Sequence, residues 1–93
     1  MIYFLQNAEG HIKIGYTTNL EQRKQTLQTG NSSLLRTLYV IEISNEESFI
    51  FEQHVHEICS QFFLQGEWFS TKVIDHLLDH PWYRTHMLAV DAL

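Results

Sequence analysis

Glu67 is the acidic residue whose neighbours most favour a chemical role, because it stands directly before two large aromatic residues, Trp68 and Phe69. Gly66 precedes it, in a segment that we predict to connect two helices. A carboxylate in such a partly dry setting can bind a metal ion, since hard divalent cations take carboxylate oxygens as ligands. The alternative is structural: Glu67 caps or precedes the final helix, and the aromatic rings fill the core.

Two basic residues, Lys13 and Arg23, have types and positions that suit phosphate chemistry. Lys13 lies in a β-prone run where lysine is unfavourable, and Gly15 in the same run permits close approach of another segment. The guanidinium of Arg23 can grip a phosphate through two parallel hydrogen bonds. Each also has an ordinary role open to it, Lys13 as a solvated edge residue and Arg23 on a solvated helix face or in an i,i+4 pair.

Three further side chains could contribute to a site. Tyr16 follows Gly15 and can hydrogen-bond a phosphate or an attacking water, or it is a core ring with its hydroxyl at the surface. Glu52 and His56 are four residues apart in a helical pattern, so they lie one turn apart. That pair is either a structural hydrogen bond or a support for the wall of the site, and we favour the supporting role for His56.

The elements that must position these side chains can be predicted from periodicity and caps. Turn residues between the first two β-prone runs indicate a hairpin. In its second strand, Ile12, Ile14 and Tyr16 share one face, while Lys13 and Gly15 take the other. The predicted elements in chain order are strands at residues 1–5 and 11–16, a helix capped by Thr18 or Asn19 and ended by Gly30 and Asn31, a strand at residues 34–43, a helix capped by Ser44 whose apolar stripe runs to Phe62, and a helix starting at Ser70.

This order, β-β-α-β-α-α, predicts an α+β fold with a small three-stranded antiparallel sheet flanked by helices. At 93 residues the chain fits one domain. Pro81 stops a preceding helix, so we expect residues 1–80 to form the core domain and residues 81–93 to form a C-terminal extension.

Taken together, these motifs resemble the GIY-YIG nuclease superfamily, and most closely its small phage-type and bacterial branch. Tyr3 stands in the first tripeptide of the family name, and Lys13-Ile14-Gly15 stands for the second, with lysine in place of tyrosine. Further matches are Arg23 in the first helix, Glu52 with His56, and the run from Gly66 to Phe69; the resemblance covers about residues 1–80.

The resemblance implies a metal-dependent endonuclease or nickase that hydrolyses DNA phosphodiester bonds. In it, Glu67 holds a single Mg²⁺ or Mn²⁺, Tyr3 with Lys13 deprotonates or orients the attacking water, and Arg23 stabilises the phosphate. If Tyr3 and Lys13 share a face of the hairpin, we expect the ammonium to lower the pKa of the phenol. The alternatives are a catalytically silent domain of the same fold that binds nucleic acid or a protein partner, and a small interaction protein that is similar in fold only.

Charge and composition limit these functions. Six Lys and Arg against eleven Asp and Glu give a net charge of −5, so we expect DNA binding to be weak or dependent on a partner. A single cysteine excludes an internal disulfide, and no apolar run approaches membrane-spanning length. We therefore expect a cytoplasmic protein without a membrane association, and the sequence leaves its oligomeric state open.

Overall fold

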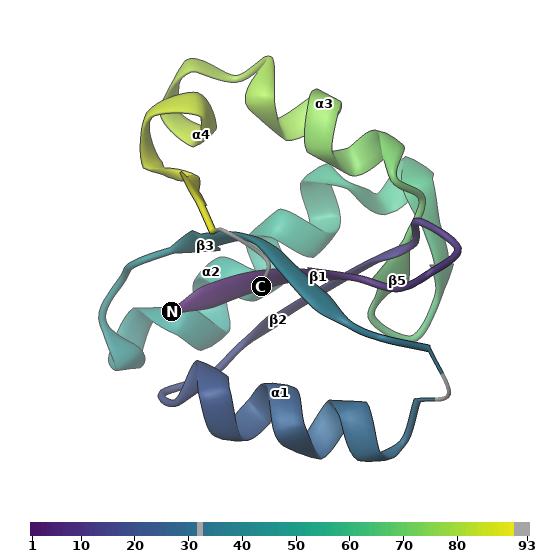
Figure 1. Ribbon diagram of the computed structural model, residues 1–93. Helices are drawn as coiled ribbons and strands as arrows, with labels where there is room; N and C mark the ends of the chain where they lie inside the picture. Colours follow the sequence, from purple (N-terminus) through teal and green to yellow (C-terminus); the bar gives the residue numbers. More distant parts are fainter. Residues whose placement is uncertain (32, 91–93) are drawn as a thin grey trace.

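The fold is an antiparallel sheet with helices on both faces, seen here in a computed structural model that describes residues 1–31 and 33–90 (Figure 1). Within these residues the strands pair in the order β4-β5-β2-β1-β3-β6, and every pairing is antiparallel. The elements are β1 (Ile2–Gln6), β2 (Ile12–Tyr16), α1 (Leu20–Thr29), β3 (Arg36–Ile41), α2 (Asn45–Ile58), the 3₁₀ turn η1 (Ser60–Phe62), β4 (Phe63–Gln65), β5 (Trp68–Phe69), α3 (Lys72–Leu78), α4 (Pro81–His86) and β6 (Leu88–Ala89).

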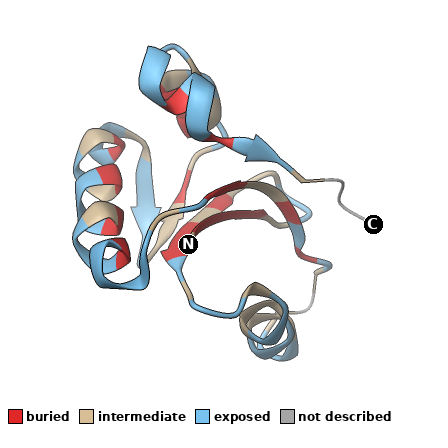
Figure 2. Cartoon of the chain, turned by 90° about the vertical axis from the view of Figure 1, so that its left-hand side faces the viewer, coloured by how far each residue is buried: buried red, intermediate tan, exposed pale blue. Residues whose placement is uncertain are grey.

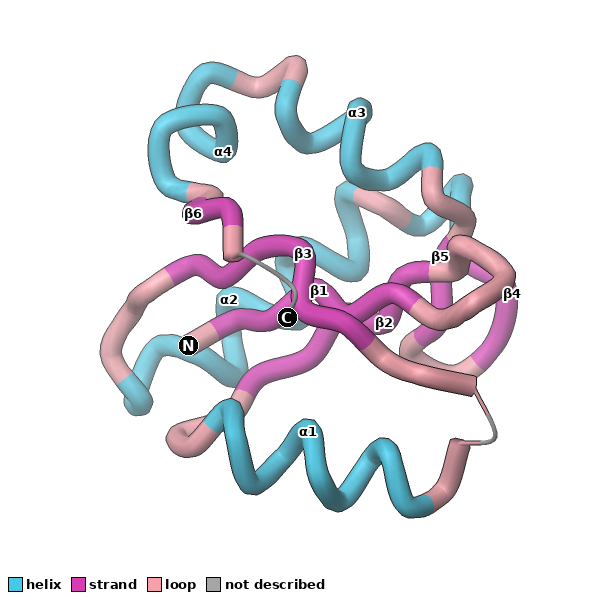
Figure 3. Tube along the Cα trace, in the orientation of Figure 1, coloured by secondary structure: helices cyan, strands magenta, loops and turns pink. Residues whose placement is uncertain are grey.

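The predicted three-stranded sheet is wrong in its strand number, although the α+β class holds. The described residues form a six-stranded sheet and four α-helices, and the three added strands span only two or three residues each (Figure 3). Such short strands carry no period-two pattern. Strands β5 and β6 form by pairing with the distant strands β2 and β3, and β4 forms a hairpin with β5. The predicted stripe to Phe62 also overran the helix, because α2 ends at Ile58 and the chain then turns through η1 into β4.

Local turn and cap chemistry follows the sequence closely. In the turn between β1 and β2, Asn7 Oδ1 accepts hydrogen bonds from the backbone of Glu9 and His11, and Gly10 takes φ of 87°. The predicted hairpin is confirmed. Of the two proposed caps for the first helix, Asn19 accepts from Gln22 N, and Ser44 caps α2 by accepting from Glu47 N.

Helices cover the two faces of the sheet unequally (Figure 1). On one face α2, α3 and α4 enclose the larger core, and on the other α1 covers a smaller cluster formed by Tyr3, Leu5 and Leu35. Strand β1 lies between the two layers, so its side chains are buried on both faces, as the buried colouring of the central strands shows (Figure 2). Tyr3 therefore belongs to the α1 side, whereas its neighbours Ile2 and Phe4 belong to the larger core.

The segment after α3 is part of this architecture. Tyr83 of α4 and Met87 are buried in the larger core, and β6 pairs with β3. The last three positions of the predicted extension, 91–93, lie outside the described residues. No helix in the described part of the chain has both the length and the apolar character needed to cross a membrane.

The close approach of Tyr3 requires a glycine at position 15. The two residues are directly opposite each other in the β1–β2 pairing, and the phenol ring lies over the glycine. A Cβ at this position would overlap both the ring and the hydroxyl of Tyr3. The absence of a side chain at Gly15 thus allows the phenol to lie across β2.

We predict that Gly15→Ala destabilises the protein by about 1–3 kcal/mol, because the added methyl forces the Tyr3 ring out of its place. The measurement is urea unfolding followed by circular dichroism. Gly30→Ala is the matched control, since its Cβ would have Leu27 O as its nearest neighbour at 3.8 Å. We expect Gly30→Ala to be neutral or slightly stabilising. Equal stability of the two variants would contradict the proposed packing.

Candidate active site

Four of the predicted site residues line one cleft of about 400 Å³: Tyr3, Tyr16, Arg23 and Glu67. They come from β1, the end of β2, α1 and the turn between β4 and β5. Residues that are distant in the sequence therefore meet where the hairpin, α1 and the β4–β5 turn converge. Lys13 forms an ion pair with Glu67 of this group, and His56 lines a neighbouring cavity together with Glu67.

Tyr3 and Arg23 form the first pair of the cleft. The Arg23 Nε–H group donates a hydrogen bond to the Tyr3 hydroxyl at 3.3 Å. Tyr3 is only 1% exposed, and burial raises the pKa of its phenol, an effect that the hydrogen bond and positive charge of Arg23 oppose in part. Tyr3 is therefore a neutral phenol at physiological pH. Arg23 is tied to the cleft and is not a free solvated helix residue.

Lys13 and Glu67 form the second pair. Lys13 Nζ lies 3.3 Å from Glu67 Oε1 and 5.4 Å from the centroid of the Trp68 ring, its partner across β2 and β5. With 13% of its side chain exposed, Lys13 is not a solvated edge lysine. The carboxylate of Glu67, at 36% exposure, faces the cleft with the ammonium beside it.

The expectation that Lys13 lowers the pKa of Tyr3 was wrong. The register places Lys13 opposite Leu5 and Tyr3 opposite Gly15, so Tyr3 and Lys13 do share a face of the hairpin. However, the pKa of Tyr3 is raised by burial, and the cation that acts on the phenol is Arg23. The ammonium of Lys13 is instead paired with Glu67.

Glu67 occupies a hairpin turn, and its predicted position in the segment between two helices is confirmed, because this turn lies between α2 and α3. Gly66 takes φ of 60°, in the left-handed region that favours glycine, and the chain reverses there between β4 and β5. The backbone N–H of Ile14 donates to the Glu67 carbonyl at 3.2 Å, which ties the turn to β2. The carboxylate is thereby held beside the hairpin that carries Lys13.

His56 supports the site from behind and does not line the main cleft. Its Nε2–H group donates to the Ile14 carbonyl at 2.9 Å, and its ring contacts the edge of Phe69 with the centroids 4.9 Å apart. His56 lines an adjacent cavity of about 450 Å³ together with Glu52 and Glu67. These contacts join α2 to β2 and to β5, the strand that follows the Glu67 turn.

Glu52 lines the main cleft, although the sequence reasoning had treated it only as the partner of His56. It is 8% exposed, lies 3.6 Å from His56 Nε2 and also lines the adjacent cavity. Burial raises the pKa of its carboxyl, the negative charge of Glu67 adds to this, and the positive charges of His56 and Lys13 oppose it. A buried acid on an apolar helix face is the signal that could have assigned Glu52 to the site.

Tyr16 and two threonines complete the rim of the cleft. Tyr16 is 41% exposed and meets the ring of Phe49 edge to face at 5.9 Å, so it is not a core residue. Thr17 and Thr18 also line the cleft, and the sequence reasoning gave them no role in the site. Their place between a strand and the cap of α1, at Asn19, is the signal that was available.

The residues present fit a hard divalent cation. Among residues 1–31 and 33–90, no group of three or more His, Cys, Asp and Glu side chains could hold a metal. A complete protein cage of that kind is therefore absent from the described part. The carboxylate of Glu67 in the open cleft provides an oxygen ligand, and Mg²⁺ commonly binds one or two carboxylates while water and phosphate fill its other positions.

Comparison with known families agrees with this arrangement. The sequence profile of the T5orf172 domain matches residues 1–80, which include every residue of the cleft. The chain belongs to the T5orf172 domain family. This is a phage-type, nuclease-like domain related to GIY-YIG and homing-endonuclease-like folds. No curated protein and no solved structure matches the chain.

For this T5orf172 domain we predict that Glu52→Gln gains stability relative to wild type as the pH rises from about 4 to 7. The folded state holds the Glu52 proton more tightly than the unfolded state does, because burial raises the pKa above its ordinary 4.5. The stability that this residue contributes is present below pH 4.5 and is lost as the pH rises toward neutrality. The amide of the glutamine variant is neutral at every pH, so the variant does not lose this stability as the pH rises.

The measurement is urea unfolding of wild type and variant at pH 4, 5, 6 and 7. Glu57→Gln is the control, because Glu57 lies on the same helix and is exposed. It should parallel wild type across the series. A difference between Glu52→Gln and wild type that does not change with pH would refute the assignment.

Proposed function

We propose that this T5orf172 domain is a GIY-YIG-type endonuclease or nickase that hydrolyses DNA phosphodiester bonds with a single Mg²⁺ or Mn²⁺. The observation that supports this most strongly is the shared cleft. A phenol bound by a guanidinium and a carboxylate bound by an ammonium face one space of about 400 Å³. We assign the catalytic unit to residues 1–80 and a C-terminal extension to residues 81–93, and the extension's Tyr83 and Met87 pack in the larger core.

In this proposal Arg23 binds the scissile phosphate. Its Nε–H group already donates to Tyr3, so the two terminal NH₂ groups remain to contact phosphate oxygens. The hydrogen bond to Tyr3 restrains the guanidinium before substrate arrives. That restraint lowers the entropy lost when the phosphate binds.

Tyr3 orients the attacking water. Because its pKa is raised, the phenol keeps its proton at neutral pH, and its oxygen accepts the hydrogen bond from Arg23. Its own O–H group is then available to a water or phosphate oxygen in the cleft. Tyr16 and the two rim threonines offer further hydroxyl groups there.

Glu67 would hold the divalent cation, with Glu52 as the second carboxylate of the cleft. When bound there, the cation supplies Lewis-acid polarisation of the phosphate. Glu67 already has Lys13 as its partner, so the carboxylate is shared, and binding before DNA arrives is expected to be weak. His56 takes a positioning role, because it holds β2 and β5 together beside the Glu67 turn.

The cations of the chain are concentrated on the side from which DNA would approach. Lys13, Arg23, Lys24 and Arg36 are four of the six basic residues, and they lie on α1 or on strands beside it. Helix α2, on the other face, carries four glutamates. The net charge of −5 is thus unevenly distributed, and we expect binding from the α1 side that is weak and strongly salt-dependent.

We predict that Glu67→Gln abolishes cation-dependent nicking of supercoiled plasmid DNA while circular dichroism remains unchanged, because an amide is a poor ligand for Mg²⁺. Glu46→Gln is the control, since Glu46 is exposed on α2 outside the cleft, and it should cut normally. Full activity of Glu67→Gln would remove the metal assignment. Wild type that binds DNA without cutting it at any Mg²⁺ or Mn²⁺ concentration would identify a catalytically silent domain.

We also predict that Arg23→Lys lowers the nicking rate by roughly a hundredfold, the scale expected when a donor that stabilises transition-state charge is lost. An ammonium keeps the charge but cannot contact Tyr3 and phosphate together as a planar guanidinium does. Arg36→Lys is the matched control, because Arg36 is exposed, bonds Gln6 and lies outside the cleft. Similar single-turnover rates for both variants would show that Arg23 does not bind the phosphate.

A further inference from the structure

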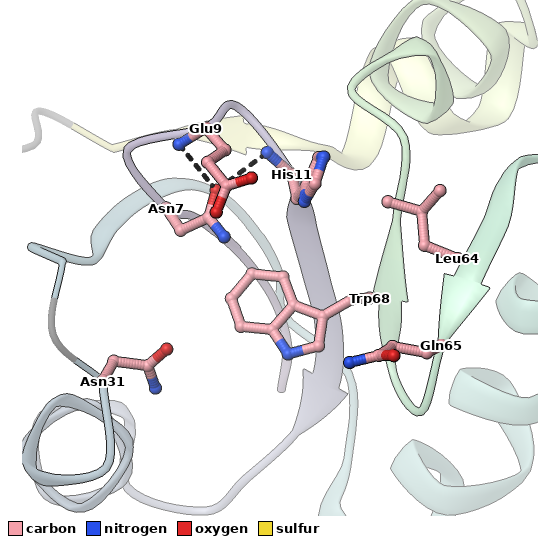
Figure 4. A pocket seen from close by; sticks show the side chains of 7 residues that line it. All are labelled: Asn7, Glu9, His11, Asn31, Leu64, Gln65 and Trp68. Carbon is pink, nitrogen blue, oxygen red and sulfur yellow. Dashed lines mark hydrogen bonds between the residues drawn. The ribbon is translucent and has the colours of Figure 1, made fainter.

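A second pocket, of about 420 Å³, is lined by Trp68, the residue whose ring lies 5.4 Å from Lys13 Nζ. The indole of Trp68 lies in the middle of the pocket and shows the face of its ring in Figure 4. Asn7 and His11 lie along one edge of the pocket, and Asn31 and Gln65 lie along other edges. Trp68 also packs against the smaller core cluster, and the proposed chemistry does not use this opening.

We propose that this pocket binds one unpaired nucleobase of the DNA substrate, stacked on Trp68. The inference rests on the proposed function, and it adds a substrate class: DNA in which a base beside the cut phosphate is out of the duplex. It also gives Trp68 a binding role in addition to its place in β5.

The link to the cleft is Lys13. Its ammonium lies 3.3 Å from Glu67 Oε1 and 5.4 Å from the Trp68 ring centroid, so a single side chain lies beside one lining residue of each site. A nucleotide has its phosphate and its base on opposite sides of the sugar. A strand whose phosphate lies in the cleft therefore has a neighbouring base within reach of Trp68.

The lining of the pocket fits a base and not a second phosphate. Its seven described lining residues include Glu9 and exclude both lysine and arginine, and the ammonium of Lys13 beside Trp68 is already paired with Glu67. Aromatic rings bind nucleobases through their faces whatever the sequence, and such stacking is sequence-tolerant. Leu64 adds an apolar contact at one side (Figure 4).

Polar groups around the indole can meet the edge of a base. Asn31 Nδ2 donates to Leu27 O at 2.7 Å, and its amide oxygen points into the pocket (Figure 4). The amide oxygen of Asn7 is taken by the backbone of Glu9 and His11, so its NH₂ group remains as a donor. With the amide of Gln65, the pocket offers both donors and acceptors.

The base must be unpaired, because a base inside a duplex already has neighbours on both faces and its hydrogen-bonding edge is occupied. Only an extruded or bulged base presents a free face to an indole that lies within a pocket. The energy needed to extrude it is smallest where the base has no partner. A bulge or mismatch is therefore the preferred substrate.

The test is fluorescence anisotropy in EDTA, where cleavage cannot occur, with three labelled duplexes of one sequence. One is fully paired, one contains a single unpaired adenine, and one contains an abasic site in place of that adenine. We expect wild type to bind the adenine bulge roughly tenfold more tightly than the other two, the scale of one stacked base. Trp68→Leu should bind all three equally, whereas Trp68→Phe should keep part of the preference.

Trp82→Leu is the matched control, because Trp82 is 39% exposed on α4 and does not line the pocket, and it should behave as wild type. Equal affinity of wild type for the three duplexes, or no binding to any, overturns the inference, as does an undiminished preference in folded Trp68→Leu. Addition of Mg²⁺ separates the two proposals. Cleavage without any preference for the bulge would support the proposed nuclease activity and contradict the base-binding pocket. A preference for the bulge without cleavage would support the base-binding pocket and contradict the nuclease activity.

Discussion

The site depends on the contact between Tyr3 and Gly15. Because Gly15 has no side chain, the phenol can lie across β2 and reach Arg23 on α1. The same antiparallel register that makes Tyr3 and Gly15 partners sets Lys13 opposite Leu5, on the same face of the hairpin. One register thus directs the phenol and the ammonium toward α1, and a slip of one residue would send the two side chains to opposite faces of the hairpin.

Stability and function are opposed at two positions in this cleft. Burial raises the pKa of the Tyr3 phenol and the pKa of the Glu52 carboxyl, so it disfavours the charged form of both side chains. A fold selected only for stability would replace a buried carboxylate with an apolar side chain. Its retention beside Glu67, where the two negative charges act on each other, is typical of sites that handle cations or protons.

How well the sequence predicted each feature depends on how far apart along the chain the interacting residues lie. The hairpin turn at Asn7 and Gly10 and the caps at Asn19 and Ser44 depend on neighbouring residues, and all were predicted correctly. The short strands β5 and β6 form by pairing with the distant strands β2 and β3, and the three-residue β4 forms a hairpin with β5, so the predicted sheet had too few strands. The exchange of cations, with Arg23 on the phenol and Lys13 on the carboxylate, depends on where α1 and the Glu67 turn lie against the hairpin. The spacing of residues along the chain does not show where α1 or the Glu67 turn lies against the hairpin.

The β4–β5 turn connects the fold to its chemistry. Glu67 is held through its carbonyl by Ile14, and Ile14 through its own carbonyl by His56, so strand β2 is bonded on one side to the turn and on the other to α2. Any displacement of β2 moves Lys13 relative to Glu67 and Trp68 together, because all three meet across β2 and β5. His56 contacts the site through the backbone of β2, and in our proposal its effect on Glu67 is one of alignment. A side chain with that role can be altered without removing a reactive group, and what it changes is the spacing between the carboxylate and the ammonium.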